Sequence, residues 1–150
     1  MFIERVKAFE KYDLTLLLEE SVSEGYNFIA KLFDEYTTGI NRFDGMGEAL
    51  FAVIRNDEVI GIGGLNRDPY LNRSDVGRVR HLYVLPAYRN MGIGKELLIT
   101  IIEEAKKHFQ ILTLYTENRA ADKMYRDAGF SRADGVYKAS HVLELARAER

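Results

Sequence analysis

The feature that most constrains the fold of this chain is a short apolar strand that turns through glycines into a long amphipathic helix. The strand is centred on residues 82–84, and the turn that follows contains Pro86, Gly92 and Gly94. Between residues 93 and 105, apolar side chains recur at helical spacing while Glu and Lys fill the opposite side. A strand joined to such a helix predicts a sheet with a helix packed on its face.

The glycine turn, residues 89–95, has the properties of a phosphate-binding site. The first N–H groups of a helix have no partner within the helix, and the helix dipole adds partial positive charge there. A bound anion satisfies both. Gly92 and Gly94 allow a pyrophosphate to approach the backbone closely, while Arg89 and Lys95 add positive charge on either side. A plain turn would require neither these cations nor a helix start, so we favour a phosphate site.

Two familiar phosphate-binding motifs do not fit these glycines. A Walker A loop needs Ser or Thr after its Gly-Lys pair, and here Glu96 follows Lys95. A dinucleotide fingerprint needs a third glycine, and Leu97 stands in its place. The glycine turn therefore belongs to another class of phosphate site.

Two segments of the chain resemble the GNAT superfamily of N-acetyltransferases. Arg89, Gly92 and Gly94 match the pattern Arg/Gln-x-x-Gly-x-Gly/Ala directly after a strand. Residues 118–130 match the family's Asn-x-x-Ala-x-x-x-Tyr-x-x-x-Gly-Phe segment, in which Tyr125 is the tyrosine. Each motif alone is degenerate, but the two occur in the usual order and at the usual separation. The resemblance covers roughly residues 47–145.

The resemblance implies the GNAT acyl-CoA N-acyltransferase fold, a mixed α/β (α+β) architecture whose mostly antiparallel sheet has helices on both faces. It implies acetyl-CoA as cosubstrate, lying between two parallel strands that splay apart. The pyrophosphate would bind the glycine turn, and the pantetheine arm would follow the backbone around residues 82–84. The residues implied to bind the cofactor are Leu82, Val84, Arg89, Asn90, Met91, Gly92, Ile93, Gly94, Lys95, Asn118 and Tyr125.

The implied reaction transfers the acetyl group to a primary amine by direct attack on the thioester in a ternary complex. The amine must first lose a proton, because an alkyl ammonium with a pKa of about 10.4 has no free lone pair. The backbone N–H of Val84 is the implied donor to the oxyanion, and Tyr125 is the implied general acid for the departing thiolate. Because Ala121, Met124 and Ala128 share a helix face with Tyr125, a purely structural role for this ring stays open.

The sequence offers no obvious carboxylate as general base. Many members of the family place a Glu on the strand before the glycine turn, where this chain has Arg78 and Arg80. His81 is the nearest titratable side chain, and its usual pKa of about 6.5 would suit a catalytic base at neutral pH. Two alternatives stay open, namely a packed or exposed His81 without a catalytic role, and proton loss through water to a more distant Glu or Asp.

Composition excludes several classes of protein. A chain of 150 residues with 47% hydrophobic side chains is expected to form one globular domain, residues 1–150. The absence of cysteine excludes thiol catalysis and disulfides, and three scattered histidines predict no metal site. A net charge of −2 argues against a nucleic-acid partner. With neither an apolar leader nor a membrane-length apolar run, we expect a cytoplasmic protein without membrane association.

The remaining pattern predicts antiparallel hairpins followed by a strand–helix–strand unit. Ser21 and Glu24 have capping-box spacing for a helix that ends at Gly39, and Asn56 with Asp57 predicts a hairpin turn. The expected elements are a strand within 1–7, a helix after Asp13, a helix from Ser21 to Gly39, strands at 50–54 and 59–65, a strand from Val79, the long helix, a strand at 111–116, a helix at 119–128, and a broken final strand or pair at 136–145.

The resemblance places the acceptor amine beside the N-terminal helices and the polar connection formed by residues 66–77. These segments combine aromatic and acidic side chains, which would attract a cationic amine. The pattern does not separate a polyamine, an aminoglycoside-like compound, an amino acid or a peptide N-terminus. The side chains concerned are Tyr26, Phe28, Asp34, Glu35, Asp68, Tyr70 and Asp75.

Two other classes of function stay open at this point. One is an acyl-CoA-binding sensor without turnover, in which a general base would be missing. The other is an unrelated module that binds a nucleotide or another phosphate ligand at the glycine turn. A homodimer is a further expectation, because Val142, Leu143 and Leu145 would give the final strand an exposed apolar edge.

Overall fold

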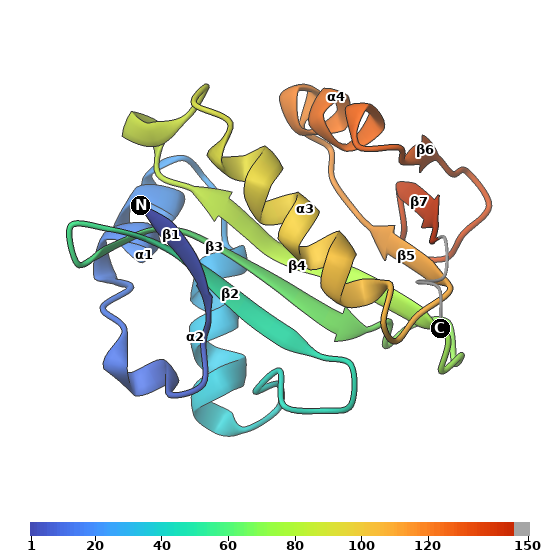
Figure 1. Cartoon of the computed structure of the whole chain (residues 1–150), viewed down its shortest axis with the longest axis horizontal. Helices are drawn as coiled ribbons and strands as arrows, with labels where there is room; N and C mark the ends of the chain where they lie inside the picture. Colours follow the sequence, from blue (N-terminus) through green and yellow to red (C-terminus); the bar gives the residue numbers. More distant parts are fainter. Residues whose placement is uncertain (146–150) are drawn as a thin grey trace.

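The computed structural model describes residues 1–145, which form a mixed α/β fold around one seven-stranded, mostly antiparallel sheet (Figure 1). The strand order is β1-β2-β3-β4-β5-β7-β6. The strands are β1 (Phe2–Arg5), β2 (Ala49–Arg55), β3 (Glu58–Arg67), β4 (Val76–Val84), β5 (Ile111–Leu114), β6 (Ser131–Arg132) and β7 (His141–Glu144). The helices are α1 (Thr15–Ser23), α2 (Phe28–Thr38), α3 (Ile93–Ala105) and α4 (Arg119–Asp127), with short 3-10 turns η1 (Phe9–Lys11) and η2 (Pro86–Tyr88). This architecture confirms the expected fold class.

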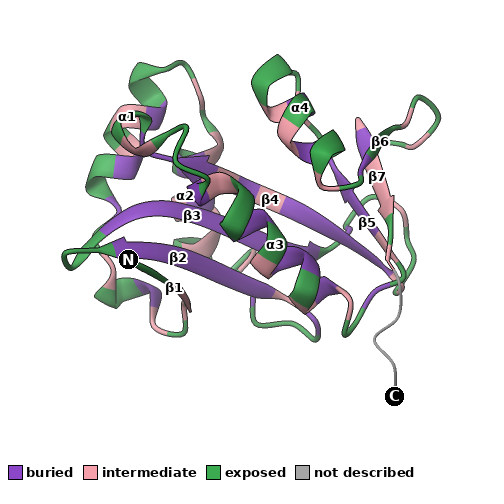
Figure 2. Cartoon of the chain, turned by 45° about the horizontal axis from the view of Figure 1, so that its top comes forward, coloured by how far each residue is buried: buried purple, intermediate pink, exposed green. Residues whose placement is uncertain are grey.

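The core lies on both faces of the central strands β2, β3 and β4, which are buried over most of their length (Figure 2). Figure 1 shows α3 in front of these strands and α1 and α2 behind them. On α3, the side chains of Leu97, Leu98 and Ile101 are fully buried. Burying a side chain of this size contributes about 1.5–3 kcal/mol to folding. The apolar stripe of the long helix is therefore a main source of stability.

A glycine in β3 lies where side chains of α3 and β4 pack closely. A Cβ atom at Gly63 would lie 2.9 Å from both Ile101 Cδ1 and Leu82 Cδ1, which is closer than carbon atoms pack. A side chain at this position would require the ends of Ile101 and Leu82 to move. The glycine thus allows the present packing between α3 and the strand that carries the predicted cofactor contacts.

The sheet opens between β4 and β5, its only parallel pair within the described chain. The two strands pair from Val76 with Ile111 to Arg78 with Thr113, and the rest of β4 has no partner in β5. A β-bulge in β4 adds to this divergence, because His81 adopts a positive φ of 57° and the register with β3 shifts between Ile62 and Gly64. The second half of β4 is consequently free to face a ligand.

Several local predictions are confirmed. Gly39 ends α2 with a positive φ of 84°, and Asn56 and Asp57 form the turn between β2 and β3 with φ values of 50° and 64°. The expected helix after Asp13 is α1, where the Asp13 carboxylate accepts a hydrogen bond from the Thr15 N–H at 3.0 Å. These are positions where a single residue type decides the backbone conformation.

The predicted start of the second helix is wrong. Ser21 lies inside α1, where it is fully buried and its hydroxyl donates to the Leu18 carbonyl at 3.0 Å. Glu24 follows the end of α1, the chain turns at Gly25 with a φ of 87°, and α2 begins at Phe28. The Ser-x-x-Glu spacing was a coincidence, because tertiary packing uses Ser21 differently.

The final strand differs from the expectation of an exposed edge. β7 lies inside the sheet, paired with β5 along its whole length and with β6 on its other side. Val142, Leu143 and Leu145 are half-buried. The edge of the sheet at this end is β6, which is too short to offer an apolar dimer strand. The predicted β5 strand also ends two residues early, at Leu114.

Candidate active site

A cavity of about 660 Å³ fills the opening between β4 and β5. It is bounded by β4 from Arg78 to Val84, the glycine turn, the start of α3, the chain after β5, α4, the first turns of α2 with the segment before it, and Tyr70 of the β3–β4 connection. We call it the larger cavity. Of the residues predicted to bind the cofactor or to act in catalysis, those that line it are His81, Leu82, Val84, Arg89, Asn90, Gly92, Ile93, Gly94, Lys95, Asn118 and Tyr125. Met91 does not line it, and its residue surface is 62% exposed.

The glycine turn presents its backbone to one end of the larger cavity. Gly92 caps the N-terminus of α3 with a φ of 80°, and no side chain caps this helix start. The free N–H groups of the first turn are therefore available to an anion. A Cβ atom at Gly94 would lie 3.3 Å from Met124 Sδ and 3.8 Å from Val84 Cγ2, so a side chain here would fill the space between α3, α4 and β4.

Arg89 is held by a carboxylate that the sequence analysis did not identify. Its guanidinium donates to both oxygens of Glu24 at 2.7 and 2.6 Å, and its Nε donates to the Val84 carbonyl at 3.0 Å. The Tyr83 hydroxyl donates to the same carboxylate at 2.5 Å. The Arg89 hydrogen bond is the main reason that the pKa of Glu24 lies below its ordinary value. Glu24 and Arg89 are 65 positions apart, so no local pattern could reveal the pair.

Tyr125 has a buried ring and a hydroxyl group that faces the larger cavity. The residue is 6% exposed, and its ring packs edge-on against Phe130 with ring centres 5.6 Å apart. Within the described chain, its hydroxyl has no hydrogen-bond partner, although it lines the cavity. Burial raises the pKa of Tyr125 above its ordinary value, so the hydroxyl carries its proton at neutral pH. The ring belongs to the core, and the hydroxyl remains free to donate.

Asn118 is the N-cap of α4. Its side-chain oxygen accepts from the backbone N–H groups of Ala120 at 2.9 Å and Ala121 at 3.2 Å, and its amide nitrogen donates to the Tyr26 hydroxyl at 3.0 Å. The side chain thereby fixes the start of the helix that carries Tyr125 and links it to the segment before α2.

His81 is buried, and neither of its ring nitrogens makes a hydrogen bond of ordinary length and angle in the described chain. Only 8% of the residue is exposed, and neither nitrogen contacts solvent. Burial, and after it the charge of Arg80, lowers the pKa of His81 to about 3, while a weak polar contact with the backbone of Phe28 raises it. The ring is therefore neutral at pH 7. An unpaired buried polar group of this kind lowers the stability of the fold, because it has lost its hydrogen bonds to water and gained none in the protein.

The acidic side chains expected to attract a cationic amine do not line the larger cavity. Asp68 is buried, where its carboxylate accepts from Thr113 at 2.6 Å and lies 3.4 Å from Arg78. Asp75 pairs with Arg73 on the surface at 2.7 Å. Of the side chains expected near the acceptor, the aromatic Tyr26, Phe28 and Tyr70 line the cavity, whereas the carboxylates do not.

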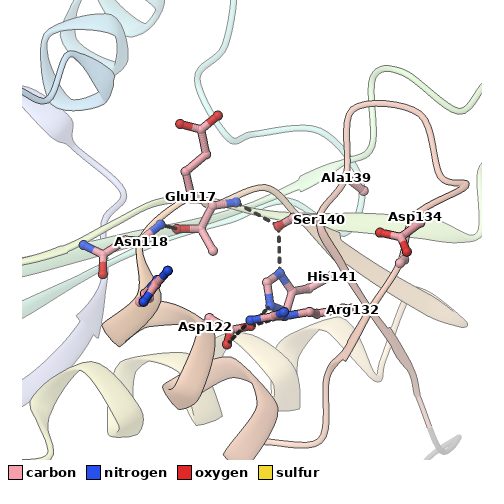
Figure 3. Close-up of a pocket in the computed structure, with 11 residues that line it drawn as sticks. Glu117, Asn118, Asp122, Arg132, Asp134, Ala139, Ser140 and His141 are labelled. Atoms are coloured by element: carbon pink, nitrogen blue, oxygen red, sulfur yellow. Dashed lines mark hydrogen bonds and ion pairs between the residues drawn. The ribbon is translucent and has the colours of Figure 1, made fainter.

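A smaller cavity of about 360 Å³ lies beside α4 and β7 (Figure 3). Here the Asp122 carboxylate accepts from His141 Nε2 at 2.7 Å and from Arg126 and Arg132 at 2.9–3.1 Å. His141 Nδ1 lies 2.7 Å from the Ser140 hydroxyl. The hydrogen bond from Arg132, followed by the bond to His141, is the main cause that lowers the pKa of Asp122. This network ties the β6–β7 hairpin to α4.

Neither metal ligands nor membrane-spanning helices are found in residues 1–145. No group of three or more His, Asp or Glu side chains in this part of the chain is arranged to hold a metal ion. None of its helices has the length and apolar character needed to cross a membrane.

Comparison with known families identifies the fold and its motifs together. Residues 14–130, which include the glycine turn and the Asn118–Phe130 segment, match the model of the Acetyltransferase (GNAT) family. The chain belongs to the GNAT acetyltransferase family. The resemblance seen in the two sequence motifs is thereby confirmed.

Solved structures share the GNAT fold over nearly the whole chain. A protein of Exiguobacterium sp. 255-15, crystallised as a candidate acetyltransferase, is 34% identical and superposes with a TM-score of 0.87 over 95% of this chain and 92% of the other. A GNAT-family acetyltransferase of Streptococcus pneumoniae is 20% identical with a TM-score of 0.75 over 97% and 99% of the two chains, which shows the shared fold.

A relative with a named acceptor matches only part of this GNAT chain. The aminoalkylphosphonate N-acetyltransferase of Salmonella typhimurium is 32% identical over 84 residues. The match spans 53% of this chain and 54% of the relative, which is about half of each. The acceptor of the present protein is therefore inferred from the residues that line its own cavity.

Proposed function

We propose that this GNAT protein transfers the acetyl group of acetyl-CoA to a primary amine by direct attack in a ternary complex within the larger cavity. The observation that carries the proposal is the shape of this cavity. It connects the uncapped start of α3 with the free hydroxyl of Tyr125 along the half of β4 that has no partner in β5. A thioester that carries a pyrophosphate at its other end needs a helix start for the pyrophosphate, a strand for its arm and a hydroxyl at the thioester.

In this proposal the glycine turn binds the pyrophosphate of the cosubstrate. The free N–H groups between Asn90 and Lys95 and the positive end of the α3 dipole would stabilise its charge. Leu82 and Val84 line the cavity on β4, where the backbone would accompany the pantetheine arm. Asn118 borders the same space from the start of α4.

The chemical step needs a donor for the departing thiolate, and we assign it to Tyr125. The amine nitrogen forms a bond to the thioester carbon, the carbon–sulfur bond breaks, and the Tyr125 proton passes to sulfur. A hydroxyl without another partner, with its pKa raised by burial, keeps this proton at all physiological pH values. The backbone N–H of Val84 is the donor that we propose for the oxyanion.

The path of the amine proton is the second part of the mechanism. His81, the base predicted from the sequence, is neutral at pH 7, but a ring with a pKa of about 3 holds a proton weakly. We therefore propose that water in the cavity carries the amine proton to bulk solvent, and that solvent afterwards returns a proton to the Tyr125 oxygen.

The named relative supports a small primary amine as the acceptor. Its name specifies aminoalkylphosphonates, which are small molecules with one primary amine. A sensor that binds acyl-CoA without turnover is the alternative, favoured by the weak basicity of His81. The homodimer and the cytoplasmic location expected from the sequence stay predictions.

Calorimetric titration with acetyl-CoA, with ADP as control ligand, tests the cosubstrate. We expect micromolar binding that ADP does not match, since ADP lacks the pantetheine arm. Release of free CoA thiol in the presence of a panel of primary amines then separates enzyme from sensor. Binding without thiol release for any amine would favour the sensor, and no binding would remove the basis of the proposal.

A further inference from the structure

We infer that the acceptor is an amine that also bears an anionic group, which Lys31 and Arg80 bind at the α2 end of the larger cavity. The anionic group is a carboxylate, phosphonate or phosphate. The inference rests on the proposed function, because it assumes that the acceptor enters this cavity. It concerns which acceptor the cavity selects and not the mechanism of acetyl transfer.

The charged side chains that line the larger cavity all have the same sign. Its lining contains Lys31, Arg78, Arg80, Arg89 and Lys95 and neither Asp nor Glu. Arg89 and Lys95 belong to the glycine turn, at the end proposed for the pyrophosphate. The other three lie at the opposite end, on α2 and the first half of β4. A second anion, separate from the cosubstrate, is the ligand that such an end attracts.

Two of the three cations at the α2 end have donors to spare. Arg78 is committed, since it donates to the Lys138 carbonyl at 2.7 Å and lies 3.4 Å from Asp68. Arg80 forms an ion pair with Glu35 at 3.7 Å, which is longer than a hydrogen bond, and its side chain is 15% exposed. Lys31 forms no ion pair with the described residues. Both side chains therefore keep N–H donors that an anionic group could use.

Lys31 and Arg80 both line the larger cavity, although Lys31 comes from α2 and Arg80 from β4. After burial, which is the main cause, the charges of Arg80 and then Lys31 also lower the pKa of His81. Two cations from different elements that line one cavity can bind the same anion.

The same charges discriminate between amines. A polyamine would bring a second positive group toward Lys31 and Arg80, which repel it. An anionic group would instead form charge-assisted hydrogen bonds with both side chains.

The test compares small primary amines that differ in the charge of their second functional group. The probes are 2-aminoethylphosphonate and β-alanine as anionic amines, ethanolamine as the neutral amine and putrescine as the cationic one. We expect kcat/KM for an anionic amine to exceed that for ethanolamine by about 10- to 100-fold, the range for a charged hydrogen bond. The ratio of kcat/KM between 2-aminoethylphosphonate and β-alanine then shows whether the site prefers a tetrahedral phosphonate or a planar carboxylate.

Variants locate the effect. Lys31→Gln is expected to raise KM for the preferred anionic amine by about 10-fold or more, with little change for ethanolamine. Arg80→Gln is expected to act in the same direction. Lys7→Gln is the matched control, because Lys7 is exposed and does not line the cavity. Affinity for acetyl-CoA, measured by titration, should remain unchanged in Lys31→Gln.

The possible outcomes separate the inference from the proposed function. Equal or better kcat/KM with ethanolamine or putrescine, or an equal loss for all amines in Lys31→Gln, would overturn the inference and leave the acetyltransferase standing. If acetyl-CoA does not bind, or if no amine releases CoA thiol, the proposed function fails and the inference fails with it.

Discussion

The two cavities of this protein share Thr116 and Asn118 in their walls but differ in how their polar groups are paired. In the smaller cavity, Arg126, Arg132 and His141 bind the Asp122 carboxylate, and His141 also contacts Ser140. Figure 3 shows the contacts of Asp122 with Arg132 and His141 and of His141 with Ser140. In the larger cavity, the His81 ring has no partner in the described chain. Buried polar groups beside the smaller cavity thus bond one another, whereas a ring beside the larger cavity is buried without a bond.

This difference distinguishes a cavity whose polar groups stabilise the fold from one that can bind a ligand. Buried polar groups that bond one another stabilise the fold and leave little for a ligand. Unpaired ones reduce stability and are retained where a ligand completes them. The paired network also has an indirect role, because Asp122 anchors the helix that carries Asn118 and Tyr125. The smaller cavity supports the position of groups that the larger one uses.

The largest effect is expected for Tyr125→Phe. If the free hydroxyl is the general acid, its removal should lower kcat by about 100-fold or more. Acetyl-CoA affinity and melting temperature should barely change, because the hydroxyl bonds nothing in the described chain. Steady-state kinetics with thermal unfolding on the same samples measure both. A parallel loss of stability and activity would return Tyr125 to a structural role.

Tyr12→Phe is the matched control for this substitution. The Tyr12 hydroxyl donates to Glu4 at 2.8 Å, away from both cavities. Its removal should cost about 0.5–1.5 kcal/mol of stability, the usual net value of a hydrogen bond. We expect kcat to be unaffected. The two tyrosines together distinguish a hydroxyl that stabilises from one that reacts.

The second effect concerns the smaller cavity. Asp122→Asn keeps the shape of the side chain but removes the charge that Arg126, Arg132 and His141 share. The melting temperature should fall by several degrees, while the folded variant keeps most of its kcat because Asp122 does not line the larger cavity. Asp127→Asn is the control on the same helix, where the exposed pair with Lys123 contributes little.

The pH dependence of the wild-type protein provides a check on Asp122. Because its pKa is lowered in the folded state, the ionised carboxylate contributes stability above its unfolded pKa of about 3.9, and this contribution is lost as the pH falls through the folded value. Asp122→Asn should remove this loss at strongly acid pH. An unchanged melting temperature at pH 7 would mean that the network is not a scaffold.

The sequence predicted the parts of the site that depend on neighbouring residues. The glycine turn, the α3 stripe and the hairpin at Asn56 each follow from a residue type at a short spacing. The splayed strands came from the family resemblance. The structure added the Glu24–Arg89 pair and the Asp122–His141 network, whose members lie far apart along the chain. Such pairs exist only once the sheet and helices are assembled, so no local pattern signals them.

Charge was the least predictable property of the site. The sequence shows acidic side chains in the segments that border the acceptor, and it does not show which way they face. In the structure, the buried Asp68 carboxylate accepts a hydrogen bond from Thr113, and Arg78 and Arg80 of β4 line the cavity. Composition therefore did not show which charges line the cavity, because side-chain pairing in the folded chain decides this.

The smallest effect, and the one of opposite sign, is expected for His81→Leu. Leucine removes two buried nitrogens that have no partner, each of which costs about 1–3 kcal/mol. The positive φ of 57° opposes the gain by about 1–2 kcal/mol, because leucine adopts this conformation less readily than histidine. We expect a net gain of about 1 kcal/mol at pH 7, measured by denaturant unfolding.

The acid dependence of stability identifies the cause. Since the folded pKa of His81 is about 3, the unfolded chain binds a proton that the folded one does not between that value and pH 6.5. Wild-type stability should therefore be complete above pH 6.5 and fall on acidification by up to about 1.4 kcal/mol per unit. His81→Leu should lack this slope. His81→Asn, whose side chain tolerates positive φ, should also lack it but keep an unpaired polar group and gain no stability. Should His81→Leu be less stable than wild type while His81→Asn is not, the imidazole is paired after all. The contrast between the two cavities would then be lost, because removing a polar side chain would destabilise both.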